Sequence, residues 1–260
     1  MGSESIRMTN EAARRVFSER AAFYRSSASH TDPAVLERLV ELALPEAGWS
    51  VLDLATGAGH TALALAPLVR RVVAYDLTRA MLSQAAALRC ERGADGLRLA
   101  QGDVHRLPFA SDAFDLVTCR RAAHHFADLP TALAEARRVL RPGCRLVIDD
   151  RSVPDDPEVD ALMNRLDVLH DPSHVRELSP TAWVEQVGAA GFTLEIVEPY
   201  ERWRPLRELM PGVETPEAEE IRRIVETLTP AAAEVFGRRR IDGEWHIQHW
   251  YLLLAARRAR

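Results

Sequence analysis

Short apolar runs alternate with amphipathic segments along the first 150 residues of the chain. The runs that carry strand-type patterning and end at turn residues are 50–54, 71–76, 97–101, 114–119 and 145–149. Apolar side chains recur at helical spacing over 61–69, 79–92 and 129–140. Strands that alternate with helices predict an α/β fold, in which a doubly wound parallel sheet carries helices on both faces.

The rest of the chain is less regular. A weak helical pattern occupies the first 30 residues, and Asp32-Pro33 marks the start of a helix over 34–44. Asp242-Gly243 is a hairpin signal ahead of the last strand, so one antiparallel strand is expected in the sheet. Beyond residue 150 the pattern predicts a helix at 180–190, a strand at 192–198, amphipathic helices within 200–240 and a strand at 247–255.

Composition narrows the class of protein. With 47% hydrophobic and 27% charged residues among 260, the chain resembles an ordinary globular protein. No apolar run approaches the roughly 20 residues of a membrane helix, and the N-terminus has no apolar signal core, so we expect a cytoplasmic protein. The chain has three cysteines without pairing or metal-ligand spacing, which we interpret as reduced thiols: Cys90, Cys119 and Cys144. A net charge of −5 disfavours nucleic acid as a partner.

The stretch Val51-Leu-Asp-Leu-Ala-Thr-Gly-Ala-Gly-His60 carries the clearest chemistry. A strand ends near Asp53, a glycine turn follows, and a helix begins. The spacing Gly57-x-Gly59-x-x-Ala62 also fits the dinucleotide fingerprint, so the turn alone does not separate NAD from other nucleotides. Asp53 would repel a pyrophosphate and attract a cationic amino-acid group, as in S-adenosylmethionine.

Two further acids follow the next two strands. Asp76 ends the second strand, where an acid can accept both ribose hydroxyls, and Asp103 with Val104 follows the third, where they suit adenine. Each acid alone could equally be a cap or turn residue. Because carboxyl ends of parallel strands share one sheet edge, the set predicts a single crevice for the cofactor.

These segments together resemble class I S-adenosylmethionine-dependent methyltransferases, in the branch of the ubiquinone/menaquinone C-methyltransferases. The matching pieces are VLDLATGAG (51–59), VVAYDLTRAML (72–82), GDVHRLPFASDAFDLVTCR (102–120), HHFAD (124–128) and EARRVLRPG (135–143). The resemblance implies a Rossmann-like seven-stranded sheet with the last strand antiparallel, in a three-layer α/β/α fold. It also implies one domain over 1–260, with an N-terminal helical lid (1–45), a cofactor-binding core (48–150) and a substrate side (151–260).

The resemblance also assigns cofactor contacts. Ala55 replaces the usual first glycine of the turn, which is tolerable if its backbone keeps a negative φ. Arg120 would line the methionine end, and Tyr24, Ser27 and His30 lie in the lid segment. The residues expected to bind S-adenosylmethionine are Asp53, Ala55, Thr56, Gly57, Gly59, Asp76, Leu77, Met81, Asp103, Val104 and Arg120.

The acceptor side is less stereotyped, because the cofactor brings the activated group. Histidine is a suitable general base, and the catalytic candidates are His124, His125 and His174. The alternative for each is a structural ring, and no ligand spacing supports a metal site. Trp183 could shape an aromatic pocket, but its helical spacing with Val187 favours a core position.

The leading functional hypothesis is therefore methyl transfer to a small molecule, such as a quinone-like or other aromatic metabolite, by a monomer or homodimer. The alternatives are an RNA methyltransferase, suggested by Arg238-Arg-Arg240, a protein that binds the cofactor without transferring its methyl group, and an NAD-dependent oxidoreductase.

Overall fold

The structure is a computed structural model that describes residues 3–210 and 215–260. An eight-stranded sheet forms its centre, with strand order β3-β2-β1-β4-β5-β8-β6 and with β7 paired to β8. The strands are β1 (Ser50–Leu54), β2 (Arg71–Asp76), β3 (Leu97–Gln101), β4 (Phe114–Arg120), β5 (Leu140–Ser152), β6 (Phe192–Pro205), β7 (Arg238–Ile241) and β8 (Glu244–Arg258).

The sheet confirms the expected class of fold. β1 to β5 pair in parallel, and β8 runs antiparallel between β5 and β6. Where seven strands were expected, the hairpin at Asp242-Gly243 adds the short β7. Both turn residues have positive φ, at 50° and 82°, as a two-residue hairpin requires.

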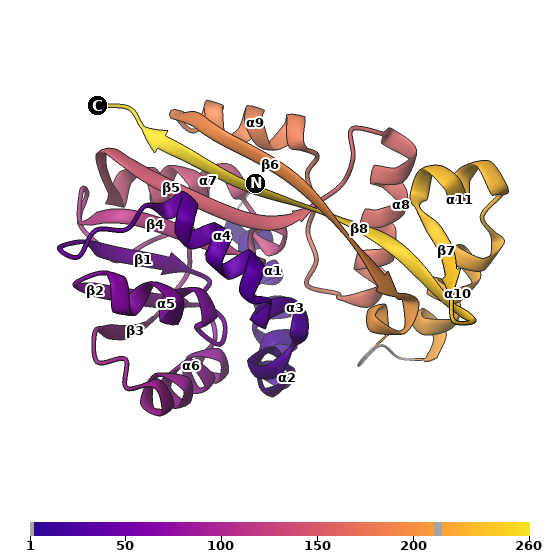
Figure 1. The fold of residues 1–260 in the computed structure, drawn as a ribbon, viewed down its shortest axis with the longest axis horizontal. Helices are drawn as coiled ribbons and strands as arrows, with labels where there is room; N and C mark the ends of the chain where they lie inside the picture. The colour runs from indigo at the N-terminus through magenta and orange to yellow at the C-terminus, as the bar shows by residue number, and fades with distance from the viewer. Residues whose placement is uncertain (1–2, 211–214) are drawn as a thin grey trace.

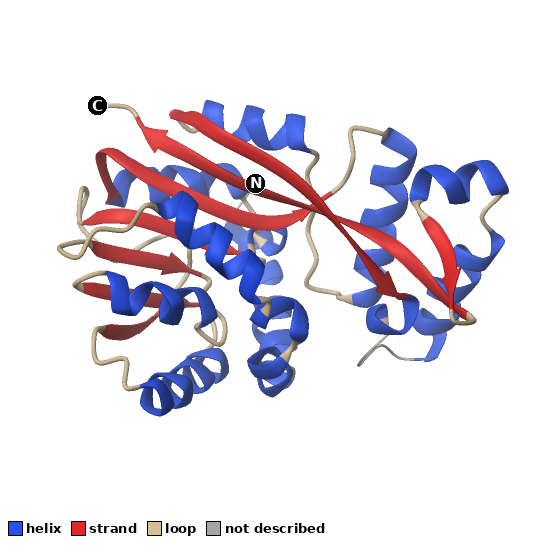
Figure 2. Cartoon of the chain, viewed as in Figure 1, coloured by secondary structure: helices blue, strands red, loops and turns tan. Residues whose placement is uncertain are grey.

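The helices cover both faces of the sheet (Figures 1 and 2). Their bounds are α1 (Ser3–Glu19), α2 (Ala21–Ser26), α3 (Ala28–Thr31), α4 (Pro33–Ala43), α5 (His60–Leu65), η1 (Ala66–Leu68), α6 (Arg79–Arg92), η2 (Ala123–His125), α7 (Leu129–Val139), α8 (Pro157–His170), α9 (Pro180–Ala189), η3 (Leu206–Leu209), α10 (Thr215–Thr227) and α11 (Pro230–Phe236). One core packs α4, α5 and α6 against the sheet, and another packs α7 and α9 on the opposite face. Trp183 is 2% exposed in the second of these cores, as its spacing predicted.

A third core lies beyond the sheet, where β6 and β8 extend past β5 (Figure 1). It packs α8, α10 and α11 around residues such as Ile221 and Ile247, both fully buried. The sequence did not predict α8, whose residues lie where the pattern loosened. It also placed residues 200–205 in a helical region, but they continue β6. Part of the region predicted as helical, residues 211–214, lies outside the described residues.

The strand and helix bounds differ from the prediction in physically simple ways. The helix expected over 61–69 ends at Leu65, and a 3₁₀ turn containing Pro67 follows, because proline cannot donate the next helical hydrogen bond. β5, β6 and β8 are each longer than their apolar runs, since their backbone pairing continues beyond those runs, as at Ser152 with Trp250 and Pro205 with His246.

The N-terminal helices cross the carboxyl edge of the sheet. Asp32 caps α4 by accepting from the amide of Ala34 at 3.0 Å, as the Asp-Pro signal predicted. Upstream of it, Asn10 contacts Asp103 after β3, and the carbonyl of His30 accepts from Arg120 at the end of β4. No helix among residues 3–210 and 215–260 is long and apolar enough to cross a membrane.

Candidate active site

The turn after β1 forms the floor of a cleft. The amide of Thr56 donates to the carbonyl of Tyr75 at 3.0 Å, and the amide of Gly57 donates to Asp76 Oδ2 at 2.8 Å. Gly57 and Gly59 have φ of 56° and 88°, in the left-handed region that glycine tolerates. A Cβ on Gly59 would lie 3.1 Å from the Cβ of Ala85, so this glycine lets α5 and α6 approach.

Ala55 corrects one expectation. Its φ is 49°, so the backbone is left-handed and the condition of a negative φ, under which alanine would be tolerable, is not met. Alanine in this region carries strain of about 1 kcal/mol.

Asp53 lies at the end of β1 and is 1% exposed. Its carboxylate accepts from Thr118 Oγ1 at 2.7 Å and from Thr56 Oγ1 at 2.5 Å. Burial raises the pKa of Asp53 to about 6, although both hydroxyls and the charge of Arg120 act in the opposite direction. A buried carboxylate held in this way favours a cation beside it.

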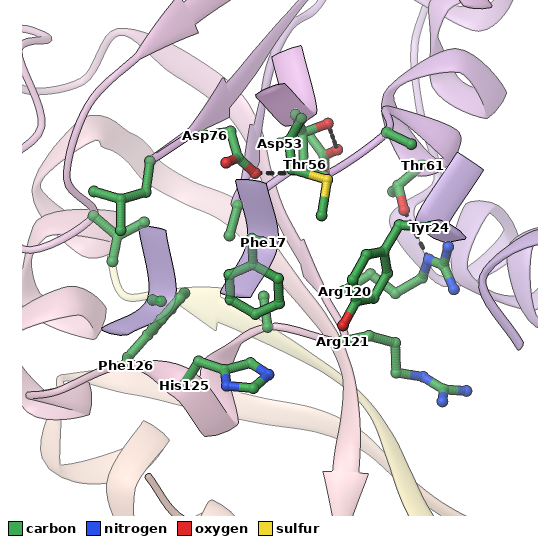
Figure 3. A pocket seen from close by; sticks show the side chains of 18 of the residues that line it. Phe17, Tyr24, Asp53, Thr56, Thr61, Asp76, Arg120, Arg121, His125 and Phe126 are labelled. Carbon is green, nitrogen blue, oxygen red and sulfur yellow. Dashed lines mark hydrogen bonds between the residues drawn. The ribbon is translucent and has the colours of Figure 1, made fainter. Parts of the chain in front are cut away.

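Asp76 ends β2 and joins that strand to the turn. Its Oδ2 accepts from Gly57, and its Oδ1 accepts from the amide and the hydroxyl of Thr78 at 2.8 and 2.9 Å. Burial raises the pKa of Asp76. Asp76 is thus a turn residue in the structure, and its carboxylate also faces the cleft (Figure 3).

Asp103 follows β3 and has partners that the sequence did not reveal. Its Oδ1 accepts from the amide and from Nδ1 of His105, at 2.9 and 2.6 Å, and its Oδ2 accepts from Asn10 Nδ2 at 2.7 Å. His105 Nε2 accepts from the amide of Asp128 at 3.1 Å, so the ring proton is on Nδ1. Asn10 comes from α1, 93 residues away, which no local pattern could indicate.

These residues enclose a space at the carboxyl edge of the sheet, which we call the glycine cleft. All the residues predicted to bind the cofactor line the glycine cleft except Gly59. Gly59 instead allows α5 to pack closely against α6. The structure adds Asn10, Phe17, His60, Thr61 and Phe126, which the sequence did not single out.

Arg120 marks one end of the glycine cleft. Its Nε donates to Thr61 Oγ1 at 2.9 Å, and Nη2 donates to the carbonyl of His30. Nη1 is buried and has no hydrogen-bond partner among the described residues; its nearest acid, Asp149 Oδ2, is 4.0 Å away. An orphaned guanidinium N–H beside the buried Asp53 fits the carboxylate and ammonium of an amino-acid group.

A second space, which we call the histidine cavity, adjoins the glycine cleft and shares lining residues with it. All the predicted catalytic histidines, His124, His125 and His174, line it. The residues that line both spaces are Tyr24, His30, Arg121 and His125. Figure 3 shows Tyr24, Arg121 and His125 on the wall of the glycine cleft.

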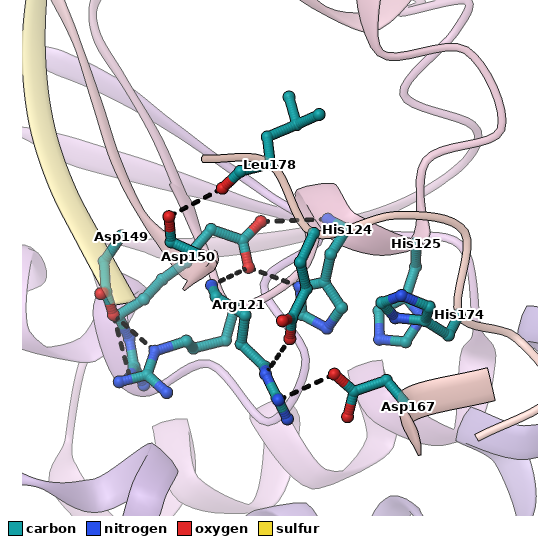
Figure 4. A network of polar contacts seen from close by, with 12 residues as sticks. Arg121, His124, His125, Asp149, Asp150, Asp167, His174 and Leu178 are labelled. Atoms are coloured by element: carbon teal, nitrogen blue, oxygen red, sulfur yellow. Dashed lines mark hydrogen bonds and ion pairs between the residues drawn. The ribbon is translucent and has the colours of Figure 1, made fainter. Parts of the chain in front are cut away.

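His124 is buried and His174 is half-buried, and each ring has a fixed partner (Figure 4). His124 Nδ1 lies 2.5 Å from Asp150 Oδ1, and its amide donates to Oδ2 of the same acid at 3.1 Å. His174 Nε2 lies 3.0 Å from Asn164 Oδ1. Burial lowers the pKa of His124 well below its usual range and that of His174 to about 4, so both rings are neutral near pH 7.

His125 is held differently. Its Nδ1 lies 3.1 Å from the carbonyl oxygen of Ser173, which can only accept, so the ring proton is on Nδ1. Phe17 of α1 packs edge-on against the ring, with centroids 4.9 Å apart. Nε2 is therefore the basic nitrogen, and the described residues provide no hydrogen bond to it.

Ionic contacts hold the floor of the histidine cavity in place (Figure 4). Arg121 Nε donates to Asp149 Oδ2 at 2.9 Å, and Nη2 donates to the hydroxyl of Tyr200 at 2.8 Å. Arg151 similarly pairs with Asp167 at 2.8 Å and with the fully buried Glu177. Within the described residues, no group of three or more His, Cys, Asp or Glu side chains is arranged to hold a metal ion.

The fold and this site define a nucleotide-binding α/β enzyme, since a glycine turn and acidic residues meet at the carboxyl edge of a parallel sheet. The comparisons with known proteins then identify the family. Residues 52–148 match the methyltransferase domain family. The chain is 41% identical over 176 residues to YcgJ of Bacillus subtilis, an uncharacterised methyltransferase, with 68% of each chain covered.

The crystal structure of YcgJ superposes with a TM-score of 0.82 and 30% identity, over 86% of this chain and 98% of that one. The demethylmenaquinone methyltransferase of Thermus thermophilus is 42% identical over 113 residues, which are 43% of this chain and 51% of that protein. The chain therefore belongs to the methyltransferase domain family, and its enzyme class is that of the S-adenosylmethionine-dependent methyltransferases.

Proposed function

We propose that the glycine cleft binds S-adenosylmethionine and that the histidine cavity binds a small-molecule acceptor. The observation that carries the proposal is the shared wall of Tyr24, His30, Arg121 and His125. Two spaces that share one wall allow donor and acceptor to be aligned while water is excluded. When bound, S-adenosylmethionine supplies the activated methyl group.

Each end of the glycine cleft has a role in this proposal. Asp53 accepts from the ammonium of the methionine moiety, and Arg120 Nη1 donates to its carboxylate. Asp76 accepts from the ribose hydroxyls, and Asp103 accepts from adenine, with Val104 against the ring face. The orphaned Nη1 and the raised pKa of Asp53 support the orientation, because each group gains a partner of opposite charge.

We propose that His125 is the general base. It is the histidine candidate that lines both spaces, and its Nε2 is free to take a proton from the acceptor. His124 and His174, the other candidates, line only the histidine cavity. Because both rings are neutral, they suit hydrogen bonding to the acceptor better than charge stabilisation.

A quinone-like or other aromatic metabolite is the acceptor that the cavity supports best. Phe23, Tyr24 and the imidazole rings are planar surfaces on which an aromatic ring can stack. Arg20 and Ser29 are polar donors for its oxygen substituents.

An RNA acceptor finds less support in the arginines that suggested it. The guanidiniums of Arg238 and Arg240 each lie 4.5 Å from the Trp245 ring centroid, and Arg239 lies 3.7 Å from that of Trp203. Arg238 also donates to the carbonyls of Val225 and Glu226 near the end of α10. These side chains are engaged in packing the protein's own helices and strands.

The test is a product screen. The protein is incubated with S-adenosylmethionine carrying a deuterated methyl group and with fractionated bacterial metabolites or, separately, total tRNA, and products are sought by mass spectrometry. A labelled small aromatic product is expected, and it should be absent with Asp76→Ala. Label in tRNA alone would refute the proposed acceptor. Binding of S-adenosylhomocysteine without any product would favour a protein that binds the cofactor without transferring its methyl group. Binding of NAD instead would refute the proposal that S-adenosylmethionine occupies the glycine cleft.

A further inference from the structure

Asn10 occupies an unexpected place in the glycine cleft. It lies on α1, is 9% exposed, and lines the cleft beside Asp103 and Val104. Its Nδ2 donates to Asp103 Oδ2 at 2.7 Å, which is a strong contact between segments 93 residues apart. This contact brings an amide to the end of the cleft assigned above to adenine.

The orientation of the Asn10 amide follows from the charge of Asp103. Burial raises the pKa of Asp103, but the hydrogen bonds from His105 and Asn10 outweigh it and hold the pKa below its usual value. The carboxylate is therefore ionised and can only accept, so the amide nitrogen must face it. The amide oxygen, Oδ1, then points elsewhere, and no described residue donates a hydrogen bond to it.

Asp103 still has room for one more donor. A carboxylate offers about four acceptor positions. Three of them are filled, by the amide of His105, Nδ1 of His105 and Nδ2 of Asn10. One acceptor position on Asp103 and the oxygen of Asn10 are therefore available to a ligand group with two N–H bonds.

We propose that Asn10 is a specificity residue of the cofactor site, which recognises the exocyclic amine of adenine together with Asp103. This inference rests on the cofactor placement proposed above. The amine has two hydrogens, one for Asn10 Oδ1 and one for Asp103. Hypoxanthine has a keto oxygen in place of the amine. That oxygen is itself an acceptor, so it would face Asn10 Oδ1 and the Asp103 carboxylate with no hydrogen to share, and all three oxygens would stay unpaired. The N-terminal helix thus takes part in choosing the ligand.

The experiment compares S-adenosylhomocysteine with S-inosylhomocysteine, which differs in having the keto group in place of the amine. Dissociation constants are measured by calorimetry for the wild type, Asn10→Ala and the control Arg14→Ala, whose residue is exposed on the same helix. The wild type should prefer the adenosyl ligand by tenfold or more, about one charge-assisted hydrogen bond. Asn10→Ala should reduce that preference by about tenfold, and Arg14→Ala should leave it unchanged.

The possible failures are distinguishable. Equal weakening of both ligands by Asn10→Ala would mean that Asn10 only positions α1, which would overturn the inference. Equal affinity of the wild type for both ligands would overturn it without any variant, whatever the stability of Asn10→Ala. If the wild type bound neither ligand, the cofactor placement itself would fail.

Discussion

Asp53 shows how a single buried carboxylate can select a ligand. Because the carboxylate is removed from water, its ionisation costs free energy. The hydrogen bonds from the hydroxyls of Thr56 and Thr118 offset only part of that cost, as the pKa of about 6 shows. A cation at this position recovers the rest. The same residue in an exposed turn would discriminate little between ligands, since water screens its charge.

Cofactor binding should therefore depend on pH through Asp53. Only the ionised carboxylate attracts an ammonium, so affinity for S-adenosylhomocysteine should fall as the pH drops below about 6, by up to about tenfold per pH unit. The pKa of Asp53 in the folded protein, about 6, lies above its ordinary value of 3.8. The contribution of Asp53 to the free energy of unfolding is therefore highest below pH 3.8 and decreases as the pH rises from 3.8 to about 6. Calorimetry at pH 5 to 8 measures the first effect. Asp53→Asn should bind weakly and without this dependence, and a flat wild-type profile would contradict the argument.

Ala55 offers a test of backbone strain. Its φ of 49° is unfavourable for alanine, so Ala55→Gly should raise the free energy of unfolding by up to about 1 kcal/mol, less the entropy that glycine adds to the unfolded chain. Urea unfolding measures the change. The matched control is Ala58→Gly in the same turn, which has no positive φ and should destabilise the protein. Equal losses in both variants would show that Ala55 carries no strain.

At the scale of elements, the site is held by contacts between strand ends. β1 and β2 pair in register from Ser50 with Arg71, which brings the turn after one strand beside the acid that ends the other. The strands of this part were predictable because their apolar runs are short and bounded by turn residues. α8 was not, because it packs in the third core with the distant α10 and α11 and with the end of β8, which local spacing does not encode.

Asp76 connects two of these elements and should affect both binding and folding. Asp76→Ala removes the partner of Gly57 and Thr78 as well as the proposed ribose acceptor. Affinity for S-adenosylhomocysteine should fall by about 1.5–3 kcal/mol for each charged hydrogen bond lost, and the melting temperature should also fall. The control is Asp95→Ala, an exposed turn acid ahead of β3. Unchanged affinity with a lower melting temperature would make Asp76 a turn residue only.

At the scale of the whole molecule, the histidine cavity is assembled from segments that are distant in sequence. The segment after β4 brings His124 and His125, the segment after α8 brings His174, and α2 brings Phe23 and Tyr24. The pairing of His124 with Asp150 joins this loop to β5. No one segment defines the cavity, which is why the sequence left the acceptor open.

His125→Ala is the test at this scale. If Nε2 takes the acceptor's proton, turnover with the acceptor found in the product screen should fall by about a hundredfold or more, while the dissociation constant of S-adenosylhomocysteine stays within a few fold. His246→Ala, in β8 and outside both spaces, should change neither. A parallel loss of turnover and cofactor affinity would assign His125 a structural role.

The sequence by itself determined the class of fold, the edge of the sheet at which the site lies and the strand-end residues that line the glycine cleft. It could do so because those residues follow strand ends, and parallel strands bring their carboxyl ends to one edge whatever else the chain does. Tertiary structure alone decided the φ of Ala55, the contact of Asn10 with Asp103 and the assembly of the histidine cavity. Each of these depends on packing between segments far apart in the chain, and local patterns of polar and apolar residues carry no record of such contacts.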